Sequence, residues 1–425
     1  MDLKFIFVSM LYCLLLYFLY PVFHEQGLFL AFRSEPHDFM HVFFVFACSL
    51  FLAIYASFLR FGIYYIFNCF LVFTTFFPFL VLMPYFDSGY VFSGVPFFAV
   101  LASFLVTTLG LLFGNDKCLV FRCNLNSKYY VVALFFVNLL SICVIVFSFR
   151  GIISFSAFHD IYAHRALYRE AVGVSSYFVH WHMMVFAPLI LVYGLARKSC
   201  FMILIAISGF LVVFLITAFK VALAIPVLIL LGFLTIRLWR SRLSGFSLAL
   251  LFAYVLFFSF VFDLIFDVKY FSALFVDRII YAHGVADLMI IEVFRDLPKA
   301  FWSNSFLRYW VESRYDVDPF IVVGQEYFGR DVRLNTNFFG DGFINAGLIG
   351  VVVSSLVASL VVLVSQMILQ GKKWEYAILI FLPHLMAILN GPIQVSLLTN
   401  GLFILWCMLL ISPRDISAFH HAQRV

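Results

Sequence analysis

Long apolar runs, each about the length of a bilayer-crossing helix, recur from one end of the chain to the other. A helix needs roughly 20 consecutive apolar residues to span hydrocarbon, because its backbone N–H and C=O groups must be satisfied within the helix. Charged residues and Pro/Gly clusters separate the runs. The pattern predicts an all-α, polytopic integral membrane protein with about twelve spanning helices, near residues 4–23, 38–58, 62–84, 92–113, 129–149, 178–196, 200–218, 221–236, 244–266, 343–368, 376–390 and 395–412.

Two intervals, near residues 150–177 and 267–342, are too polar to cross a membrane and are predicted to be long loops. Within the second, apolar residues from Val285 to Arg295 recur near helical spacing, and Pro298 ends the pattern. Tryptophans follow closely. This segment is therefore predicted to lie along the membrane interface, the alternative being a surface helix on the loop's own small core.

The composition excludes a soluble globular protein. Hydrophobic residues make up 65% of the 425 and charged residues 12%, which is too little polar surface to cover a globule in water. The net charge of +5 is modest and no basic tract stands out, so nucleic acid is not an expected partner. No internal repeat or soluble domain is visible. Residues 1–425 are expected to form one integral-membrane domain.

Basic residues gather in the short connections on one side of the predicted helices. By the positive-inside rule this side is cytoplasmic, so both termini are expected inside the cell and the two long loops outside. The basic residues of these connections are Arg60, Lys117, Arg122, Lys128, Arg197, Lys198, Arg237, Arg240, Arg242, Lys372 and Lys373.

No cysteine or acidic motif makes a convincing metal site or disulfide framework. None of the eight cysteines falls in the long loops, and Cys118 with Cys123 has no histidine or further cysteine beside it. Asp316 and Asp318 match the D-x-D that nucleotide-sugar transferases use for a divalent metal, but nucleotide sugars are cytoplasmic and this loop is predicted to lie outside. We expect no metal and no cofactor.

The first long loop carries two arginines, Arg165 and Arg169, spaced for one turn of a helix. Like charges at this spacing repel by roughly 0.2–0.5 kcal/mol, so their pairing favours an anion between them, with phosphate the obvious candidate. In the alternative, Asp160 and Glu170 neutralise the arginines on a solvated helix.

The second long loop ends in a run of amides, glycines and one carboxylate at the mouth of a predicted spanning helix. The run extends from Asn335 through Asp341 to Gly350, and Arg330 and Arg333 precede it. Polar groups at that depth are costly unless they face water or a ligand, and a helix N-terminus there could receive an oxyanion. The alternative is a glycine-rich helix-packing seam with an N-cap.

In layout and in this run, Asn-Phe-Phe-Gly-Asp-Gly-Phe-Ile-Asn-Ala-Gly-Leu-Ile-Gly, the chain resembles the O-antigen polymerases, known as Wzy, among the oligosaccharide repeat-unit polymerases of bacterial inner membranes. The resemblance implies a GT-C-like glycosyltransferase architecture. It further implies an undecaprenyl-diphosphate-linked oligosaccharide as substrate, without ATP or cofactor. Expected partners are membrane lipids, a chain-length regulator protein and a flippase.

The resemblance also suggests roles for particular residues, with periplasmic arginines handling the polyprenyl diphosphate. Candidate catalytic residues are His164, Asp341, Arg165 and Arg330, with His159 and Asp160 as alternative bases. Candidate substrate-binding residues are Arg169, Arg333, Arg278, Arg314, Asn337 and Tyr162.

Two other functions use the same lipid-linked glycans. A flippase or transporter would be expected to show inverted repeats and charged or broken helices near the midplane, whereas charge here lies in the outer loops, which favours an enzyme. An O-antigen ligase, which delivers the same donor to lipid A-core, stays open as an alternative.

Overall fold

Helices are the regular elements of the computed structural model throughout the residues that it describes. These are residues 2–24, 32, 36, 39–59, 62–86, 95–113, 126–171, 173–238, 245–267, 271–370 and 373–413. Apart from helices they contain one isolated bridge, between Phe32 and Phe86, so the predicted all-α class is confirmed for them. Several residues discussed above lie outside this description: Cys118, Cys123, Arg60, Lys117, Arg122, Arg240, Arg242 and Lys372.

Nine of the described helical segments are long and apolar enough to cross a membrane. They coincide with nine of the predicted runs. At the other three, the described helices are shorter: Phe98–Phe113, Glu375–Leu389 and Leu402–Ile411. The chain therefore has the elements of a polytopic membrane protein, while the count of about twelve spans stays a prediction.

The chain divides into two compact units, each assembled from separate segments. Unit 1 comprises Met1–Asn115, Arg242–Leu363 and Ile388–Ile393. Unit 2 comprises Asp116–Ser241, Val364–Ala387 and Gln394–Val425. The first long loop belongs to unit 2 and the second to unit 1. The expectation of one integral-membrane domain stays a prediction.

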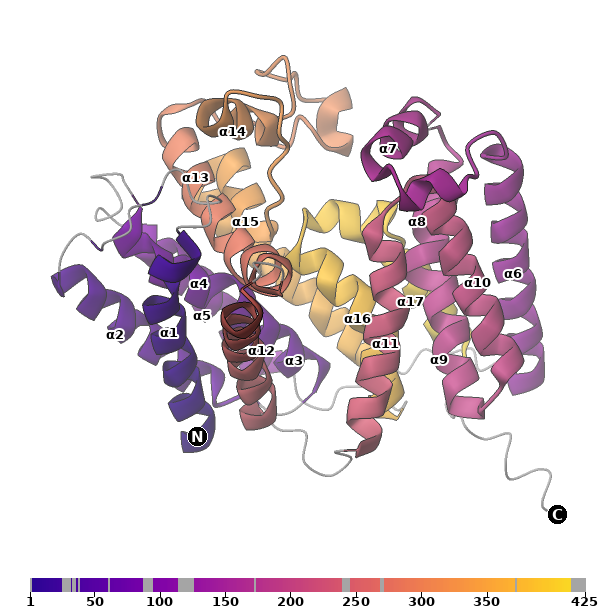
Figure 1. Cartoon of the computed structure of the whole chain (residues 1–425), viewed down its shortest axis with the longest axis horizontal. Helices are drawn as coiled ribbons and strands as arrows, with labels where there is room; N and C mark the ends of the chain where they lie inside the picture. The colour runs from indigo at the N-terminus through magenta and orange to yellow at the C-terminus, as the bar shows by residue number, and fades with distance from the viewer. Residues whose placement is uncertain are drawn as a thin grey trace. The chain divides into compact units, whose positions relative to one another are not determined.

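Unit 1 is built around a continuous helical segment that is buried almost throughout. The span Ile63–Tyr85 is 94% buried, and it runs through the consecutive helices α3, η1, α4 and η2 (Figure 1). The elements of unit 1 are α1 (Leu3–His24), α2 (Phe39–Ala56), α3 (Ile63–Leu71), η1 (Val72–Phe76), α4 (Phe77–Leu82), η2 (Met83–Tyr85), α5 (Val95–Phe113), α12 (Gly245–Phe266), η5 (Ser272–Tyr281), α13 (Ala282–Asp296), η6 (Phe306–Tyr309), α14 (Pro319–Phe328) and most of α15 (Phe338–Leu369).

Aromatic side chains fill the centre of unit 1. The Phe73 ring stacks on Phe252 of α12 at 5.1 Å and meets the Tyr12 ring of α1 edge-on at 5.1 Å. The buried hydroxyl of Tyr12 donates to the Phe73 carbonyl at 2.8 Å, and that of Tyr281 donates to the Leu16 carbonyl at 2.8 Å. Much of the chain's phenylalanine therefore packs helix against helix.

Helix α13 contains the segment predicted to lie along the membrane interface, and the structure places it in the core of unit 1. Its residues His283–Ile291 are buried without a break, and it packs on α4 and η5. The helical periodicity was thus correct. The exposed face expected of an interfacial or surface helix is covered here by neighbouring elements.

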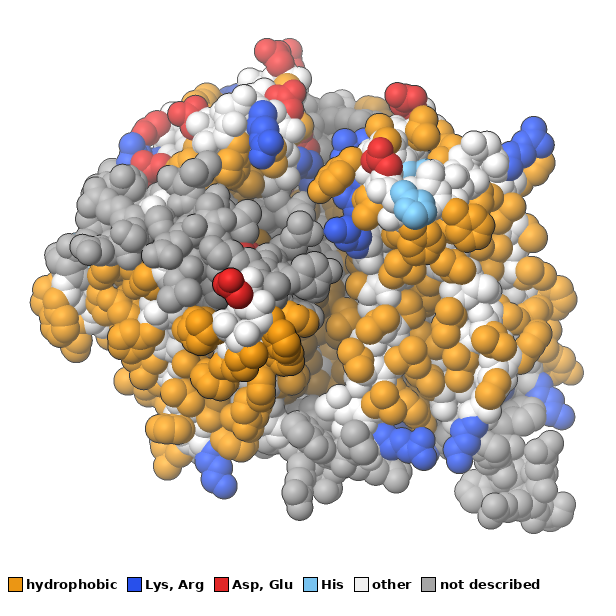
Figure 2. Space-filling view, in the orientation of Figure 1, with side chains coloured by type: hydrophobic (Ala, Val, Ile, Leu, Met, Phe, Trp, Pro, Cys, Tyr) orange, Lys and Arg blue, Asp and Glu red, His pale blue; other side chains and the backbone are white. Residues whose placement is uncertain are grey.

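Unit 2 packs its helices around a mostly buried segment, Ser176–Arg197, of which 78% is buried. Its outer helices turn large apolar side chains outward, as Phe136 and Leu140 of α6 show at 62% exposure each. Figure 2 shows an apolar surface band over these helices, as expected for a surface that faces lipid. The elements are α6 (Ser127–Ser148), η3 (Phe155–Phe158), α7 (Ile161–Glu170), α8 (Ser176–Trp181), η4 (His182–Phe186), α9 (Ala187–Arg197), α10 (Cys200–Thr217), α11 (Lys220–Leu238), the end of α15, α16 (Trp374–Leu389), η7 (Val395–Thr399) and α17 (Leu402–Ile411).

Candidate functional site

The first long loop folds into η3 and α7, and α7 rests on the turn between α10 and α11. Asp160 caps the helix, since its Oδ1 accepts from the Ala163 N–H at 3.0 Å. His164 faces inward and is 2% exposed. Its Nε2 lies 2.9 Å from the Leu215 carbonyl oxygen, so Nε2 donates, and its Nδ1 lies 3.4 Å from Ser156 Oγ. Both ring nitrogens have protein partners, which suits His164 to anchoring α7 and leaves no nitrogen for a substrate proton.

Arg165 is held in place at the same turn. Its Nε donates to the Ala218 carbonyl at 3.2 Å, and its guanidinium carbon lies 5.8 Å from the Phe219 ring centroid and 6.0 Å from that of Tyr162. These contacts occupy one edge of the guanidinium and flank its planar faces. Tyr162 itself is 77% exposed, so this part of the predicted binding group faces solvent.

Arg169 follows one turn after Arg165 and is exposed. Within the described residues neither arginine forms an ion pair with a carboxylate, and the Asp160 carboxyl accepts a backbone N–H as the helix cap. The alternative of internal neutralisation by Asp160 and Glu170 is therefore not what the structure shows. An anion bound between the two guanidinium groups would relieve their repulsion.

A buried carboxyl cluster joins α13 to the start of α15 in unit 1. Asp287, fully buried, accepts from Thr336 Oγ1 at 2.6 Å and from Asn337 Nδ2 at 2.9 Å. Asn337 Oδ1 accepts in turn from the Phe339 N–H at 2.7 Å, which caps α15. Burial raises the pKa of Asp287 to about 7, with the two donated bonds acting in the opposite direction. Asn337 therefore serves an internal cluster, and its amide is not presented to solvent.

Helix α15 is broken near its start, at Ala346 and Gly347. Gly347 adopts φ 58° and ψ −136°, a conformation that essentially only glycine tolerates. Across the break the two helical pieces approach closely, since a Cβ at Gly342 would lie 2.5 Å from the carbonyl oxygen of Gly350. These glycines therefore form a packing seam within one broken helix, in line with the alternative considered for this run.

The chain just before η6 is tied onto the broken end of α15. The Ala300 and Phe301 N–H groups donate to the carbonyls of Ile344 and Asn345, at 3.1 Å each. Asn345 Oδ1 accepts from the Trp302 N–H at 2.6 Å, and Asn345 Nδ2 donates to Asp341 Oδ1 at 3.1 Å. Helix carbonyls left without partners by the break are thereby satisfied. Asp341, 2% exposed, belongs to this internal network.

Lys299 lies beside the same break. Its ammonium group donates to the Phe294 carbonyl and sits 4.5 Å from the Phe343 ring centroid. Partial burial lowers the pKa of Lys299, and the nearby Asp296 carboxylate opposes that shift. The position brings a cation close to the end of a helix segment, where it complements the carbonyl dipoles.

The arginines of the second long loop differ in how far their guanidinium groups are engaged by neighbouring residues. Arg333 pairs with Asp318 at 3.1 Å and lies 4.8 Å from the Phe320 ring, so it is committed to fixing α14. Arg314 is exposed, 5.2 Å from the Phe301 ring. Arg330 is exposed and, within the described residues, forms no ion pair. Arg278 lies in η5, and its side chain is outside the described set.

Asp287 and Lys299 are the polar groups whose role was missed from sequence. Asp287 lies within the segment from Val285 to Arg295 and was assigned no role from the sequence. Its burial depends on partners 49 and 50 residues away, Thr336 and Asn337. The sequence contained one indication that this carboxyl is buried. Asp287 lies one turn after Gly284 on a helix whose other residues are mostly apolar.

The predicted site residues fall into two groups. His164, Arg165, Arg169 and Tyr162 come together on and around α7 in unit 2, whereas Arg330, Arg333, Arg314, Asn337 and Asp341 belong to unit 1. In the residues that the structure describes, the fold is all-helical and has nine helical segments long and apolar enough to cross a membrane, as in a polytopic membrane protein, with both groups of arginines outside these segments. No family model, curated protein or solved structure matches the chain.

Proposed function

We propose that the protein is an O-antigen polymerase, which joins undecaprenyl-diphosphate-linked oligosaccharide repeat units on the periplasmic face of a bacterial inner membrane. One observation carries the proposal. Arg165 and Arg169 lie one turn apart on α7, and neither is paired with a carboxylate in the described part of the chain. Fixed, unpaired guanidinium groups outside the candidate spans suit a membrane-anchored diphosphate.

The reaction breaks the bond between the anomeric carbon of the donor sugar and its diphosphate oxygen. A hydroxyl of the acceptor sugar forms the new glycosidic bond and loses its proton, while polyprenyl diphosphate leaves with the bonding electrons. Negative charge grows on the diphosphate as the bond breaks. Pre-positioned arginines stabilise that charge without reorganising at the moment of reaction.

In this proposal Arg165 and Arg169 bind one diphosphate. Arg165 contributes the more rigid group because the Ala218 carbonyl holds its Nε at 3.2 Å, and Arg169 contributes an exposed group one turn away. The reaction joins two lipid-linked molecules, each of which carries a diphosphate. Arg330 and Arg314, exposed in unit 1, stay further candidates for binding phosphate.

The acceptor proton requires a base, and among the histidines and acids considered, His159 fits best. It is exposed, directly precedes the Asp160 cap, and has no side-chain hydrogen bond within the described residues. His164 and Asp341 are buried in internal networks, and Asp160 caps α7. Among these candidates we therefore propose His159 as the base, in place of His164 and Asp341.

Elongation by the purified protein tests the proposal. Undecaprenyl-diphosphate oligosaccharide is supplied alone, and the products are separated by chain length. We expect a ladder from the unmodified protein, none from Arg165→Ala or Arg330→Ala, and partial recovery with Arg165→Lys, because lysine keeps the charge without the planar fork. Arg150→Ala is the matched control, since Arg150 is exposed in unit 2 and lies 5.5 Å from the Phe147 ring, with no ion pair among the described residues.

Two results would overturn the assignment. A full ladder from both alanine variants would exclude the arginines, and no ladder from the folded, unmodified protein would exclude the polymerase. A parallel reaction that contains lipid A-core as acceptor distinguishes a polymerase from a ligase. Transfer to lipid A-core with no elongation of the lipid-linked glycan would identify the chain as a ligase instead.

A further inference from the structure

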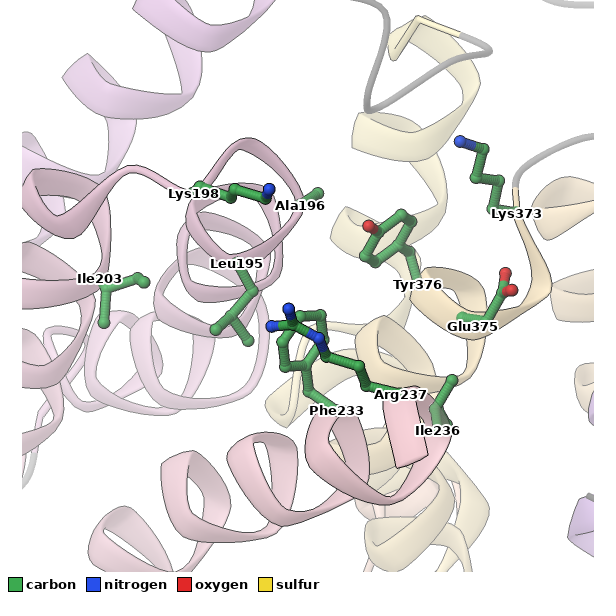
Figure 3. A pocket seen from close by; sticks show the side chains of 10 residues that line it. All are labelled: Leu195, Ala196, Lys198, Ile203, Phe233, Ile236, Arg237, Lys373, Glu375 and Tyr376. Carbon is green, nitrogen blue, oxygen red and sulfur yellow. The ribbon is translucent and has the colours of Figure 1, made fainter. Parts of the chain in front are cut away.

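A pocket of about 770 Å³ lies at one end of the helices of unit 2, away from α7. Helices α9 and α11 end there and α10 and α16 begin there. The volume is within the range of ligand sites, about 300–1,000 Å³. Figure 3 shows the ten residues that line it: Leu195, Ala196, Lys198, Ile203, Phe233, Ile236, Arg237, Lys373, Glu375 and Tyr376.

The pocket is framed by helices in close contact. On one side α9 and α10 pack so tightly that a Cβ at Gly194 would lie 3.1 Å from the Ile203 backbone nitrogen. On the other, a Cβ at Gly232 of α11 would lie 2.8 Å from Leu379 of α16. These contacts hold α9 against α10 and α11 against α16, the helices that frame the pocket.

Cationic and apolar groups share the lining. The lining includes three cations, Lys198, Arg237 and Lys373, and one carboxylate, Glu375. In Figure 3 the Arg237 guanidinium and the Tyr376 hydroxyl point into the same central space. The other lining residues, Leu195, Ala196, Ile203, Phe233 and Ile236, are apolar. The lining therefore suits a ligand that carries a negative head and a hydrocarbon body.

Helix dipoles alone do not account for the three cations. Lys198 and Arg237 lie at the C-terminal ends of α9 and α11, where a cation is favourable without any ligand. Lys373 directly precedes the N-terminus of α16, where a cation is unfavourable by about 0.3–1 kcal/mol. The Glu375 carboxylate, in the first turn of the same helix, favours that end and offsets part of the cost, and a bound anion would add to this effect.

We infer that this pocket binds the phosphate head group and the upper acyl chain of an anionic phospholipid. The four helix ends around it belong to connections that the charge pattern predicts to be cytoplasmic, where the leaflet is rich in anionic lipid. The apolar part of the lining favours a lipid over free phosphate, because phosphate has no hydrocarbon chain to pack against it. This inference does not depend on the proposed glycosyl transfer.

Lipid titration of the purified, detergent-solubilised protein tests the inference. Phosphatidylglycerol, phosphatidylcholine and inorganic phosphate are added separately, and bound lipid is counted by native mass spectrometry while thermal unfolding is followed in parallel. We expect binding and a raised unfolding temperature with phosphatidylglycerol only. Each of Lys198→Gln and Arg237→Gln should weaken the apparent affinity about fivefold, since a basic residue near a lipid surface contributes about that factor.

Lys128→Gln is the matched control, because Lys128 is an exposed lysine of unit 2 on the same predicted side but outside the pocket. An equal effect of phosphate would make this a phosphate site and overturn the lipid. An equal loss of affinity in Lys128→Gln would mean that the overall positive charge, and not the pocket, determines lipid binding. Where a pocket variant elutes as an aggregate, the head-group preference of the unmodified protein decides alone, and equal binding of phosphatidylcholine would refute the inference.

Discussion

The buried carboxyl of Asp287 makes its ionisation part of the folding equilibrium of unit 1. Because burial raises the pKa from 3.8 to about 7, the folded state holds a proton that the unfolded chain has already released at pH 5. The folded state binds more protons in this window, so stability falls as the pH rises from about 4 to about 7 and is constant above it.

Asp287→Asn removes this dependence. Between pH 5 and pH 7 the unmodified protein should lose about 2 kcal/mol relative to the variant, at about 1.4 kcal/mol for each pH unit until the carboxyl begins to ionise near pH 7. His283, one turn earlier, has a pKa lowered to about 4 by burial and acts in the opposite direction below pH 6.5. Both proteins contain it, so the difference between their unfolding curves in detergent isolates Asp287. A difference that does not change with pH would contradict the buried, protonated carboxyl.

Substitutions of His159, just before α7, and of His164, within it, should distinguish a loss of activity from a loss of stability. His159→Asn is expected to reduce elongation at least 100-fold, a typical loss for a general base, while the unfolding temperature stays unchanged. His164→Ala removes both hydrogen bonds of a buried ring and should cost about 1–3 kcal/mol of stability. Single-turnover elongation and thermal unfolding of both variants check this. Full elongation by His159→Asn would show that His159 is not the base.

At the scale of elements, the break in α15 depends on one residue. Gly347→Ala introduces a side chain at φ 58°, and we expect a loss of about 1–3 kcal/mol. Gly151→Ala is the control, since a Cβ there meets nothing within 4 Å. Chemical unfolding of the two variants gives the comparison. Equal stability would mean that α15 runs straight through this position.

The sequence predicted where the helices lie, but it did not predict which residues pack against them. Uninterrupted apolar length was enough to find the nine long spans, because a bilayer imposes that length. The spacing of Arg165 and Arg169 suited the helix that the structure has at α7, whereas the capping role of Asp160 was not predicted. Burial of α13 and the break at Ala346–Gly347 were not foreseen, because periodicity locates one apolar face and says nothing about what covers the other. The partners of Asp287 were hidden by sequence distance.

At the scale of the molecule, the orientation in the membrane is the prediction on which the proposed reaction rests. Cysteines replacing Tyr162 in unit 2 and Tyr309 in unit 1, which are 77% and 74% exposed, should react with a membrane-impermeant maleimide added from the periplasm. A cysteine at Lys198 should react only after lysis. The exposed Cys143, Cys200 and Cys407 are first replaced by serine. The opposite reactivity would place the arginines where no lipid-linked glycan is presented.

The seating of α7 on the α10–α11 turn has a mechanical consequence. His164 and Arg165 fasten the helix to the carbonyls of Leu215 and Ala218, so α7 cannot swing aside as an independent lid. In the proposed reaction, a glycan whose diphosphate is bound by Arg169 would transmit any pull to the turn between the candidate spans α10 and α11.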